Sequence, residues 1–467
     1  MTYEESRDNE IKSQNIRHVE DFIKSYDPNK KTVIFLPGGL GSQLERTTKP
    51  YKENSFGLFK NYETVWIDVG IIFESDALTL EIMENGRDKG SHIIIPNGPL
   101  RFFVKPYDET GNFFRNNGYN YTVFGFDWRR PIEEGASWLH DFLRRFRDGV
   151  ISRFKNDKTK DPLPTTTLLC HSHGGLVAKV FLNRVFKDNT IKVSSWMEQL
   201  ITVATPFYGN STHMKRYYKG ESALNQIHGA KKIAKIAGSL PGPYIFLYLD
   251  KNTFNKDGSK LGLTRYPIRD ADNQTLDADP FSSSTMTRYP KWIKTEFLNQ
   301  AVSLRNALTK ELPKSVIDHI FHVRAGRDKT TRVELFWKNI DGSKFDPEND
   351  PSPIRGIEGP GDGTVPIWSA RLAQTPDTQI FDLKLAKDHT SLMEHDETLK
   401  VVQKIIETGV IPKKVVAEDK ILGVKKASAE KAEKFISDVR ENRIKMKDTI
   451  ATDPAIWRKV IEEVTLC

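Results

Sequence analysis

The residues best suited to covalent chemistry lie between a short apolar run and an amphipathic segment. Residues 165–179 read TTTLLCHSHGGLVAK. The run at 167–170 predicts a buried strand, and the segment that follows carries its apolar residues on one helical face. A serine between a strand and a helix, with small residues two positions before and after it, is typical of a nucleophile elbow. Those residues are Cys170 and Gly174, and the nucleophile is Ser172. The alternative interpretation of this serine is a helix N-cap.

A nucleophilic serine needs a base that takes its proton and an acid that orients the base. In α/β hydrolases the chain order is serine, acid, histidine. Asp362 lies in the run GDGTVP (361–366), and His389 follows the strand predicted at 379–385. Both order and context therefore predict Ser172, Asp362 and His389 as a catalytic triad. The alternatives are a turn-forming role for Asp362, since Asp-Gly pairs favour turns, and a plain loop position for His389.

Other titratable residues near these positions are weaker candidates. His395 is expected within the helix predicted at about 393–408, and Asp388 and Asp396 are expected to cap that helix. His171 and His173 flank the serine, but elbow geometry should turn their side chains away from its hydroxyl. No metal-ligand spacing such as H-E-x-x-H is present, so we expect no metal and no cofactor.

A glycine-rich loop follows the first predicted strand. The strand is expected at 32–36 (TVIFL), and the loop reads PGGLGS at 37–42. The sequence has no phosphate-binding G-x-x-x-x-G-K-[ST] and no G-x-G-x-x-G there. Glycines also let a backbone N–H face a developing negative charge, so the loop favours an oxyanion hole. We predict its donors to be the N–H groups of Gly39 and His173. The alternative is a tight turn after the strand.

Strands alternate with helices between residues 32 and 408, which predicts a mostly parallel sheet with helices on both faces. Further strands are predicted at 92–95, 122–126, 200–204 and 319–325, and helices at 136–155 and, more briefly, around 18–26. This alternation of strands and helices is interrupted at 210–315, which favours an inserted cap or lid. A loop is expected at 341–366. We therefore expect a lead-in at 1–30, a core at 31–209 and 316–412, the cap at 210–315, and a charged helical tail at 413–467.

Composition narrows the class of protein. The 467 residues are 38% hydrophobic and 28% charged, and 70 basic against 62 acidic residues give a net charge of +8. This small, interspersed excess favours anionic surfaces and does not indicate nucleic acid. The two cysteines, Cys170 and Cys467, argue against a disulfide framework. Neither a signal peptide nor a membrane-spanning run is visible, so a cytoplasmic protein is expected, with peripheral membrane association or export by another route as alternatives.

Several motifs together resemble one family. The sequence is similar to the lecithin:cholesterol acyltransferase family, which includes lysosomal phospholipase A2 and phospholipid:diacylglycerol acyltransferases. The similar segments, in the family's order, are LPGGLGSQLE (36–45), WID (66–68), FDWR (126–129), HSHGG (171–175), ATPFYG (204–209), GDGTVP (361–366) and His389. The set of PGxLGSxLE, DWR and GDGTVP is specific, whereas the serine motif alone is not.

This resemblance implies an α/β-hydrolase fold and an acyl-enzyme that passes a fatty acyl group from a phospholipid-like ester to an alcohol or to water. It also implies that Gly39 and His173 belong to the oxyanion hole, and that Trp66 and Phe73 belong to a part that contacts substrate or membrane. The chain departs from secreted members in having no signal peptide and no disulfides, and neither its cap nor its tail matches. The alternatives are a lipase or carboxylesterase acting on neutral esters, and a non-catalytic lipid-binding protein of the same fold. The oligomeric state stays open.

Overall fold

A six-stranded sheet forms the centre of the protein. The computed structural model describes residues 2–52, 62–66, 80–99, 107–155, 166–187, 191–220, 229–386 and 388–418. The strand order is β12-β9-β7-β6-β1-β5, and all neighbouring strands are parallel. The strands are β1 (Thr32–Leu36), β5 (Asn120–Val123), β6 (Thr166–His171), β7 (Gln199–Val203), β9 (Ile320–Ala325) and β12 (Ile380–Leu383). Each overlaps a strand predicted from its apolar run, because strands buried on both faces are apolar throughout.

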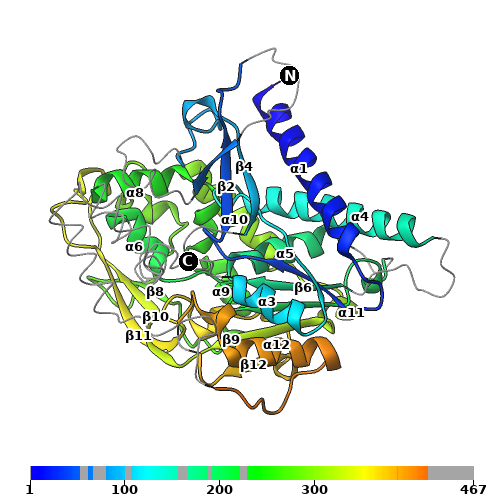
Figure 1. Cartoon of the computed structure of the whole chain (residues 1–467). Helices are drawn as coiled ribbons and strands as arrows, with labels where there is room; N and C mark the ends of the chain where they lie inside the picture. The colour runs from blue at the N-terminus through cyan, green and yellow to red at the C-terminus, as the bar shows by residue number, and fades with distance from the viewer. Residues whose placement is uncertain are drawn as a thin grey trace, which may run out of the picture.

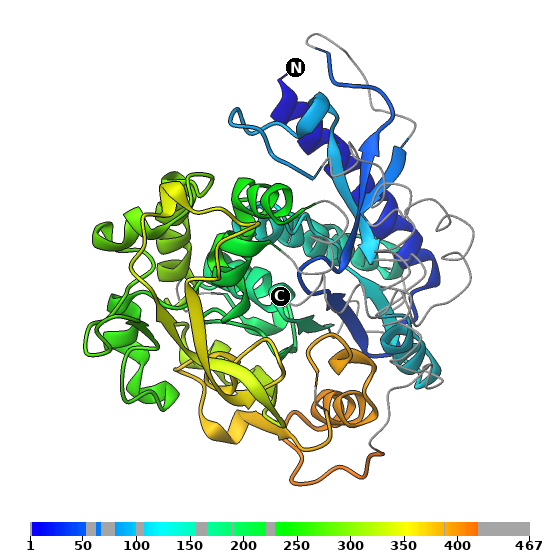
Figure 2. The same cartoon turned by 90° about the vertical axis from the view of Figure 1, so that its left-hand side faces the viewer.

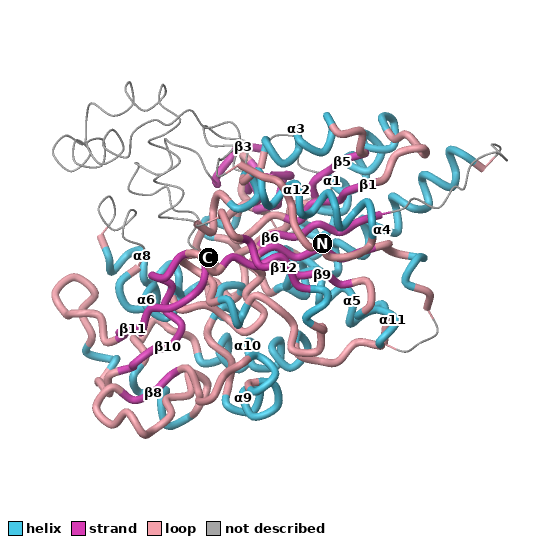
Figure 3. The backbone as a smooth tube through the Cα atoms, turned by 90° about the horizontal axis from the view of Figure 1, so that it is seen from below, coloured by secondary structure: helices cyan, strands magenta, loops and turns pink. Residues whose placement is uncertain are grey.

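Helices cover both faces of this sheet, as Figures 1 and 3 show. On one face lie α4 (Ile132–Phe154) and α5 (His173–Val185), with α1 (Tyr3–Ser25) packed on α4 and α10 (Thr295–Leu308) on α5. On the other lie α3 (Asp108–Asn116) and α12 (Asp396–Thr408). Successive side chains of β1 point to opposite faces of the sheet, so they belong to two different core clusters. Ile34 and Leu36 pack in the first cluster, on the α4 and α5 face, whereas Val33 and Phe35 pack in the second, on the α3 and α12 face. This architecture is the α/β-hydrolase fold.

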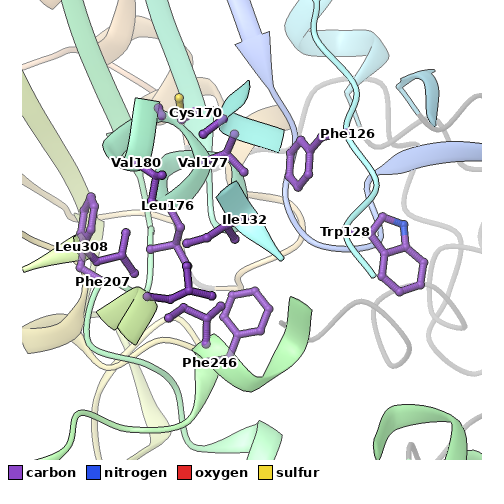
Figure 4. Close-up of a cluster of buried hydrophobic side chains, with 14 of the residues drawn as sticks. Phe126, Trp128, Ile132, Cys170, Leu176, Val177, Val180, Phe207, Phe246 and Leu308 are labelled. Atoms are coloured by element: carbon purple, nitrogen blue, oxygen red, sulfur yellow. The ribbon is translucent and has the colours of Figure 1, made fainter. Parts of the chain in front are cut away.

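The first core cluster lies directly beneath the elbow. Figure 4 shows Leu176 and Val177 of α5 among side chains from α4, from the segment after β7 and from residues 210–315. Cys170 is part of this cluster and is fully buried, and burial raises the pKa of its thiol well above the usual value. The thiol therefore serves as a small apolar group, which agrees with its expected role as a small residue before the serine.

The N-terminal helix differs from its prediction. The sequence indicated only a short helix within about 18–26, whereas α1 is 23 residues long and lies beside α4 (Figure 1). The first half of α1 is polar, so the sequence does not show that this part of the helix is buried. Arg7 is buried because it pairs with Asp127 at 3.0 Å and with Glu134 at 2.6 Å. Asp127 in turn pairs with the fully buried Arg129 at 2.7 Å. The FDWR segment thus supplies the charges that hold this helix on the core.

The described residues of the segment predicted as a cap, 210–220 and 229–315, form short helices and a strand. These are α6 (Thr212–Lys219), α8 (Ala230–Ser239), α9 (Lys251–Asp257), β8 (Ile268–Asp270) and α10, and α11 (Lys314–Ile317) leads back to the core. Strand β8 joins β10 (Asp328–Trp337) and β11 (Ile354–Gly361) in a second sheet, which Figure 2 shows in yellow beside the green helices. The loop expected at 341–366 is thus partly wrong, because it contains β11. The pairing with β10 is long-range, and local composition does not reveal it.

Arg305 joins residues 210–315 to the central sheet. It is fully buried on α10, and its guanidinium donates to the carbonyl of Phe207, which follows β7, and to those of Ile245 and Leu247. Burial lowers the pKa of Arg305 to about 10. Three carbonyls therefore hold one cation where the two parts meet.

A third sheet of three strands lies next to the glycine-rich loop that follows β1. Its order is β3-β2-β4, formed by β2 (Ser42–Thr47), β3 (Tyr62–Trp66) and β4 (Ile94–Pro99), with antiparallel pairing. Of the helices that the structure describes, none has the length and apolar character needed to cross a bilayer. Phe73 and residues 419–467, hence most of the predicted tail, lie outside the described residues.

Candidate active site

Ser172 occupies a sharp turn between β6 and α5. Its backbone angles are φ 49° and ψ −118°, and positive φ is unfavourable for a residue with a side chain. The turn is held on both sides, since the Ser172 N–H donates to the Val203 carbonyl at 2.9 Å and the Ser172 carbonyl accepts from the Gly175 N–H at 3.1 Å. Local strain that the surrounding structure maintains is typical of functional sites. This is the strand–turn–helix geometry of a nucleophile elbow.

The two glycines after the serine allow α5 to approach the sheet. A Cβ atom on Gly174 would collide with the backbone carbonyls of Leu36 and Pro37, and a Cβ on Gly175 would collide with the side chain of Thr205. The glycines are therefore required by close packing at the carboxyl end of β1 and β7. The small residue predicted two positions after the serine has this physical cause.

Asp362 and His389 lie in direct contact. His389 Nδ1 is 2.7 Å from Asp362 Oδ2, and both side chains are buried. The other oxygen, Asp362 Oδ1, accepts the N–H groups of Thr364 at 3.0 Å and of Val365 at 2.7 Å. The two interpretations of Asp362 are thus compatible, because one oxygen forms the turn and the other orients the histidine. With a hydrogen on Nδ1, which it shares with this carboxyl group, Nε2 is the ring nitrogen that is left to take a proton.

The free ring nitrogen of His389 is buried and has no hydrogen-bond partner among the described residues. The ring lies beside the elbow, since its centroid is 4.8 Å from that of His171, the residue before the serine. The hydrogen bond expected between Ser172 Oγ and His389 Nε2 is not formed. In enzymes without substrate such contacts are often long and shorten only in the complex.

The two predicted oxyanion donors belong to the loop after β1 and to the start of α5. The Gly39 N–H makes no hydrogen bond within the described part of the chain. His173 is the first residue of α5, where N–H groups lack an intrahelical acceptor. The neighbouring Gly38 faces the serine: a Cβ built on Gly38 would lie 3.3 Å from Ser172 Cβ. His173 thus follows Ser172 directly, and Gly39 follows a residue that lies against Ser172.

The His173 ring lies below the turn and away from the other candidate residues. It packs between Phe126 and Phe246, with ring centroids 5.1 Å and 4.7 Å away. Burial lowers the pKa of His173 to about 3, and neither ring nitrogen has a hydrogen-bond partner in the described structure. The side chain is therefore neutral, and only the backbone of His173 is suited to the predicted role.

Trp66 lies in the core. Its side chain is 2% exposed, packs on Trp128 at 5.4 Å and donates its indole N–H to the Leu40 carbonyl at 2.7 Å. Leu40 has a positive φ of 62° in the glycine-rich loop after β1, so Trp66 supports this loop. Contact of Trp66 and Phe73 with lipid stays a prediction.

The weaker candidates occupy other positions. His395 precedes α12 as its N-cap residue and does not lie within the helix, although its side chain makes no cap bond. Asp388 does not cap that helix either, because it accepts from the N–H of Ser391 and the hydroxyl of Thr390, each at 3.0 Å, and so folds the loop after His389. Asp396 is the first helical residue and pairs with Lys400.

The sequence analysis assigned no function to the side chains of two residues at the site, Tyr107 and His171. Tyr107 OH is 3.0 Å from His171 Nδ1 and accepts the Gly38 N–H at 3.0 Å. His171 Nε2 is 3.1 Å from the carbonyl oxygen of His389. His171 was visible next to the serine, but Tyr107 comes from a distant segment of the chain and only the fold brings it here.

Comparison with known proteins places the fold in context. No protein-family model and no curated protein matches the sequence. Among solved structures, a chain of the Tle4–Tli4 complex is 13% identical with a TM-score of 0.48, covering 81% of this chain and 99% of that chain. The mature lipase BlEst2 of Bacillus licheniformis is 14% identical with a TM-score of 0.34, covering 82% and 94%. Phospholipase PlaB of Legionella pneumophila is 12% identical with a TM-score of 0.24, covering 67% and 52%. At these identities the similarity concerns the fold and not the reaction.

Proposed function

We propose that the chain is a serine-dependent enzyme that transfers a fatty acyl group from a phospholipid-like ester to an alcohol or to water. The observation that carries this proposal is the contact of Asp362 with His389 beside the strained turn at Ser172. A non-catalytic lipid-binding protein would have no need for a buried acid–histidine pair whose outer nitrogen is unpaired. The proposal therefore favours catalysis over binding alone.

The reaction proceeds in two displacements. Ser172 Oγ attacks the ester carbonyl while His389 Nε2 takes its proton, and the negative charge on the former carbonyl oxygen is stabilised by the N–H groups of Gly39 and His173. The C–O bond to the leaving alcohol breaks as His389 returns the proton to that alcohol. The acceptor, water or an alcohol, then loses a proton to His389 and attacks the acyl-enzyme. Ser172 leaves with that proton, and the enzyme is restored.

The lipid substrate is inferred from the resemblance to the lecithin:cholesterol acyltransferase family. That family's PGxLGSxLE, DWR and GDGTVP segments have counterparts here around the oxyanion loop, the buried charge cluster and the acid. We assign residues 210–315 as a lid over the site and a bilayer surface as the source of substrate. A triacylglycerol lipase or carboxylesterase with the same triad is the second candidate, because nothing in the triad selects the head group.

Product analysis on phospholipid liposomes tests the proposal. Wild type, Ser172→Ala and the control Ser303→Ala, an exposed position on α10, are incubated with liposomes, with and without a long-chain alcohol. We expect lysophospholipid from wild type and the control, a new ester only when alcohol is present, and neither product from Ser172→Ala. Free fatty acid in place of ester would identify a phospholipase. Activity on short soluble esters alone would favour the carboxylesterase.

The non-catalytic alternative is tested separately. A fluorophosphonate probe reacts covalently with an activated serine and not with an ordinary hydroxyl. We expect labelling of wild type and loss of labelling in Ser172→Ala. Unlabelled wild-type protein that still binds liposomes would contradict the enzymatic proposal.

A further inference from the structure

We propose that Tyr107 and His171 are positioning residues, which connect the oxyanion loop to the loop of the catalytic base through a buried chain of hydrogen bonds. The chain runs from the Gly38 N–H to Tyr107 OH at 3.0 Å, from Tyr107 OH to His171 Nδ1 at 3.0 Å, and from His171 Nε2 to the His389 carbonyl at 3.1 Å. This inference rests on the proposed function, because it assigns these residues to that same site.

The hydrogens in this chain can be placed in one way only. The His389 carbonyl can only accept, so His171 Nε2 must carry a hydrogen. Burial, together with the neighbouring His389, lowers the pKa of His171 well below its usual value, so its ring is neutral. Nδ1 then has a lone pair and accepts from the Tyr107 hydroxyl. The Tyr107 oxygen in turn accepts from the Gly38 N–H.

Both ends of this hydrogen-bond chain lie beside the groups proposed to react. Gly38 precedes Gly39, the predicted oxyanion donor, and the Cβ position of Gly38 lies 3.1 Å from His171 Nδ1. At the other end, the His389 carbonyl belongs to the residue whose Nδ1 contacts Asp362. The His171 and His389 rings also lie against each other, with centroids 4.8 Å apart and planes inclined by 36°. The chain therefore fixes the oxyanion loop and the base relative to the nucleophile between them.

The four residues come from four separate segments. Gly38 follows β1, Tyr107 precedes α3, His171 ends β6, and His389 follows β12. Loops at the carboxyl ends of strands move more easily than the strands. Because the donor and base must be held closely for catalysis, and a displacement of about 1 Å can lower the rate about 100-fold, a connection between these loops has a direct effect on turnover.

Tyr107→Phe is the first test, with Tyr121→Phe as the matched control. Both changes remove one buried hydroxyl and keep the ring, and both rings pack on Phe35. The Tyr121 hydroxyl has no hydrogen-bond partner in the described structure, so its loss should leave activity unchanged. For Tyr107→Phe we expect kcat on a soluble p-nitrophenyl ester to fall about 10- to 100-fold with KM within about twofold. Fluorophosphonate labelling of Ser172 should slow in parallel.

Substitutions of His171 separate the two arms of the chain. Asn can place an acceptor near the position of Nδ1 but cannot reach the His389 carbonyl, whereas Gln can donate from the position of Nε2. We expect His171→Ala to lose kcat most, and His171→Asn and His171→Gln each to recover part of it. Thermal unfolding of each variant shows whether it folds, and kcat is compared among folded variants only.

The outcomes separate this inference from the proposed function. If Ser172→Ala is inactive but Tyr107→Phe and the folded His171 variants turn over like wild type, the positioning role is wrong and the enzymatic function stands. A raised KM with unchanged kcat would also overturn it, because that result indicates substrate binding. If Ser172→Ala retains activity, the proposed function itself fails.

Discussion

Asp362 Oδ2 accepts a hydrogen bond from His389 Nδ1 at 2.7 Å, while Asp362 Oδ1 is held by two backbone N–H groups of its own turn. The carboxylate therefore cannot rotate without breaking bonds on both sides. The turn that looks like an ordinary Asp-Gly structure in the sequence is also what fixes the tautomer of the histidine.

Replacing Asp362 by Asn tests this relationship. The amide can present an N–H to His389, which would favour the wrong tautomer and remove the lone pair from Nε2. We expect kcat to fall about 10³- to 10⁴-fold with little change in KM, by analogy with the corresponding change in serine proteases. Steady-state kinetics on a soluble ester measure this. The control is Asp382→Asn on β12, a surface residue paired with Arg324, for which activity should be unchanged.

The charge cluster that holds α1 can be tested by stability. Arg129 is fully buried, and its pairs with Asp88 and Asp127 are 2.9 Å and 2.7 Å long. Burial alone would raise the pKa of Asp127, but Arg129, followed by Arg7 and Arg130, outweighs it and holds that pKa below its usual value. Arg129→Leu removes the guanidinium that neutralises the buried carboxylates of Asp88 and Asp127.

We expect Arg129→Leu to lower the free energy of unfolding by about 3–5 kcal/mol at pH 7 in urea titrations. The control Arg144→Leu removes a half-exposed pair with Asp141 on α4 and should cost less than about 1 kcal/mol. Because the folded pKa of Asp127 is depressed, this stabilisation is present above its unfolded pKa and is lost as pH falls toward the folded value. A loss of similar size in both variants would contradict the buried cluster.

The buried ring of His173 predicts a second pH effect. Its pKa is lowered to about 3 by burial, so below pH 6.5 the unfolded chain takes up a proton that the folded protein does not. Stability should therefore decrease as pH falls, by about 2 kcal/mol between pH 7 and pH 5 from this residue alone.

His173→Phe removes this effect and keeps the backbone N–H. Since neither ring nitrogen has a hydrogen-bond partner in the described structure, we expect the variant to be more stable than wild type by about 1 kcal/mol at pH 7, with a shallower loss toward pH 5. Unfolding curves at the two pH values measure both quantities. An unchanged slope would mean that the ring is already protonated or that it exchanges with solvent.

The elbow glycines predict a packing effect. A Cβ on Gly174 would meet the backbone carbonyls of Leu36 and Pro37, which cannot move aside, whereas a Cβ on Gly149 in α4 would collide with the terminal methyl of Ile23. We expect Gly174→Ala to lower the free energy of unfolding by about 1–3 kcal/mol or more and to abolish labelling of Ser172. Gly149→Ala should be neutral or stabilising, because alanine favours the helix by about 1 kcal/mol. Equal stability of the two variants would contradict the close approach.

The sequence by itself determined the central sheet and the positions of the candidate acid, base and nucleophile. Fully buried parallel strands are apolar along their whole length, so β1, β6 and β7 are visible without any structure. The loops after such strands gather at one edge of the sheet, which is why chain order and turn composition were enough to bring Asp362 and His389 together in the prediction. These signals are local, and they need no knowledge of distant contacts.

The tertiary structure decided what depends on distant partners. The first half of α1 was expected only as part of a lead-in, because Arg7 is buried by carboxylates about 120 residues away in the sequence. Strand β8 is visible only through its pairing with β10. Tyr107 has no motif of its own and acquires its position from His171 and Gly38. In each case the structure depends on a partner that is distant in the sequence, and local composition does not indicate that partner.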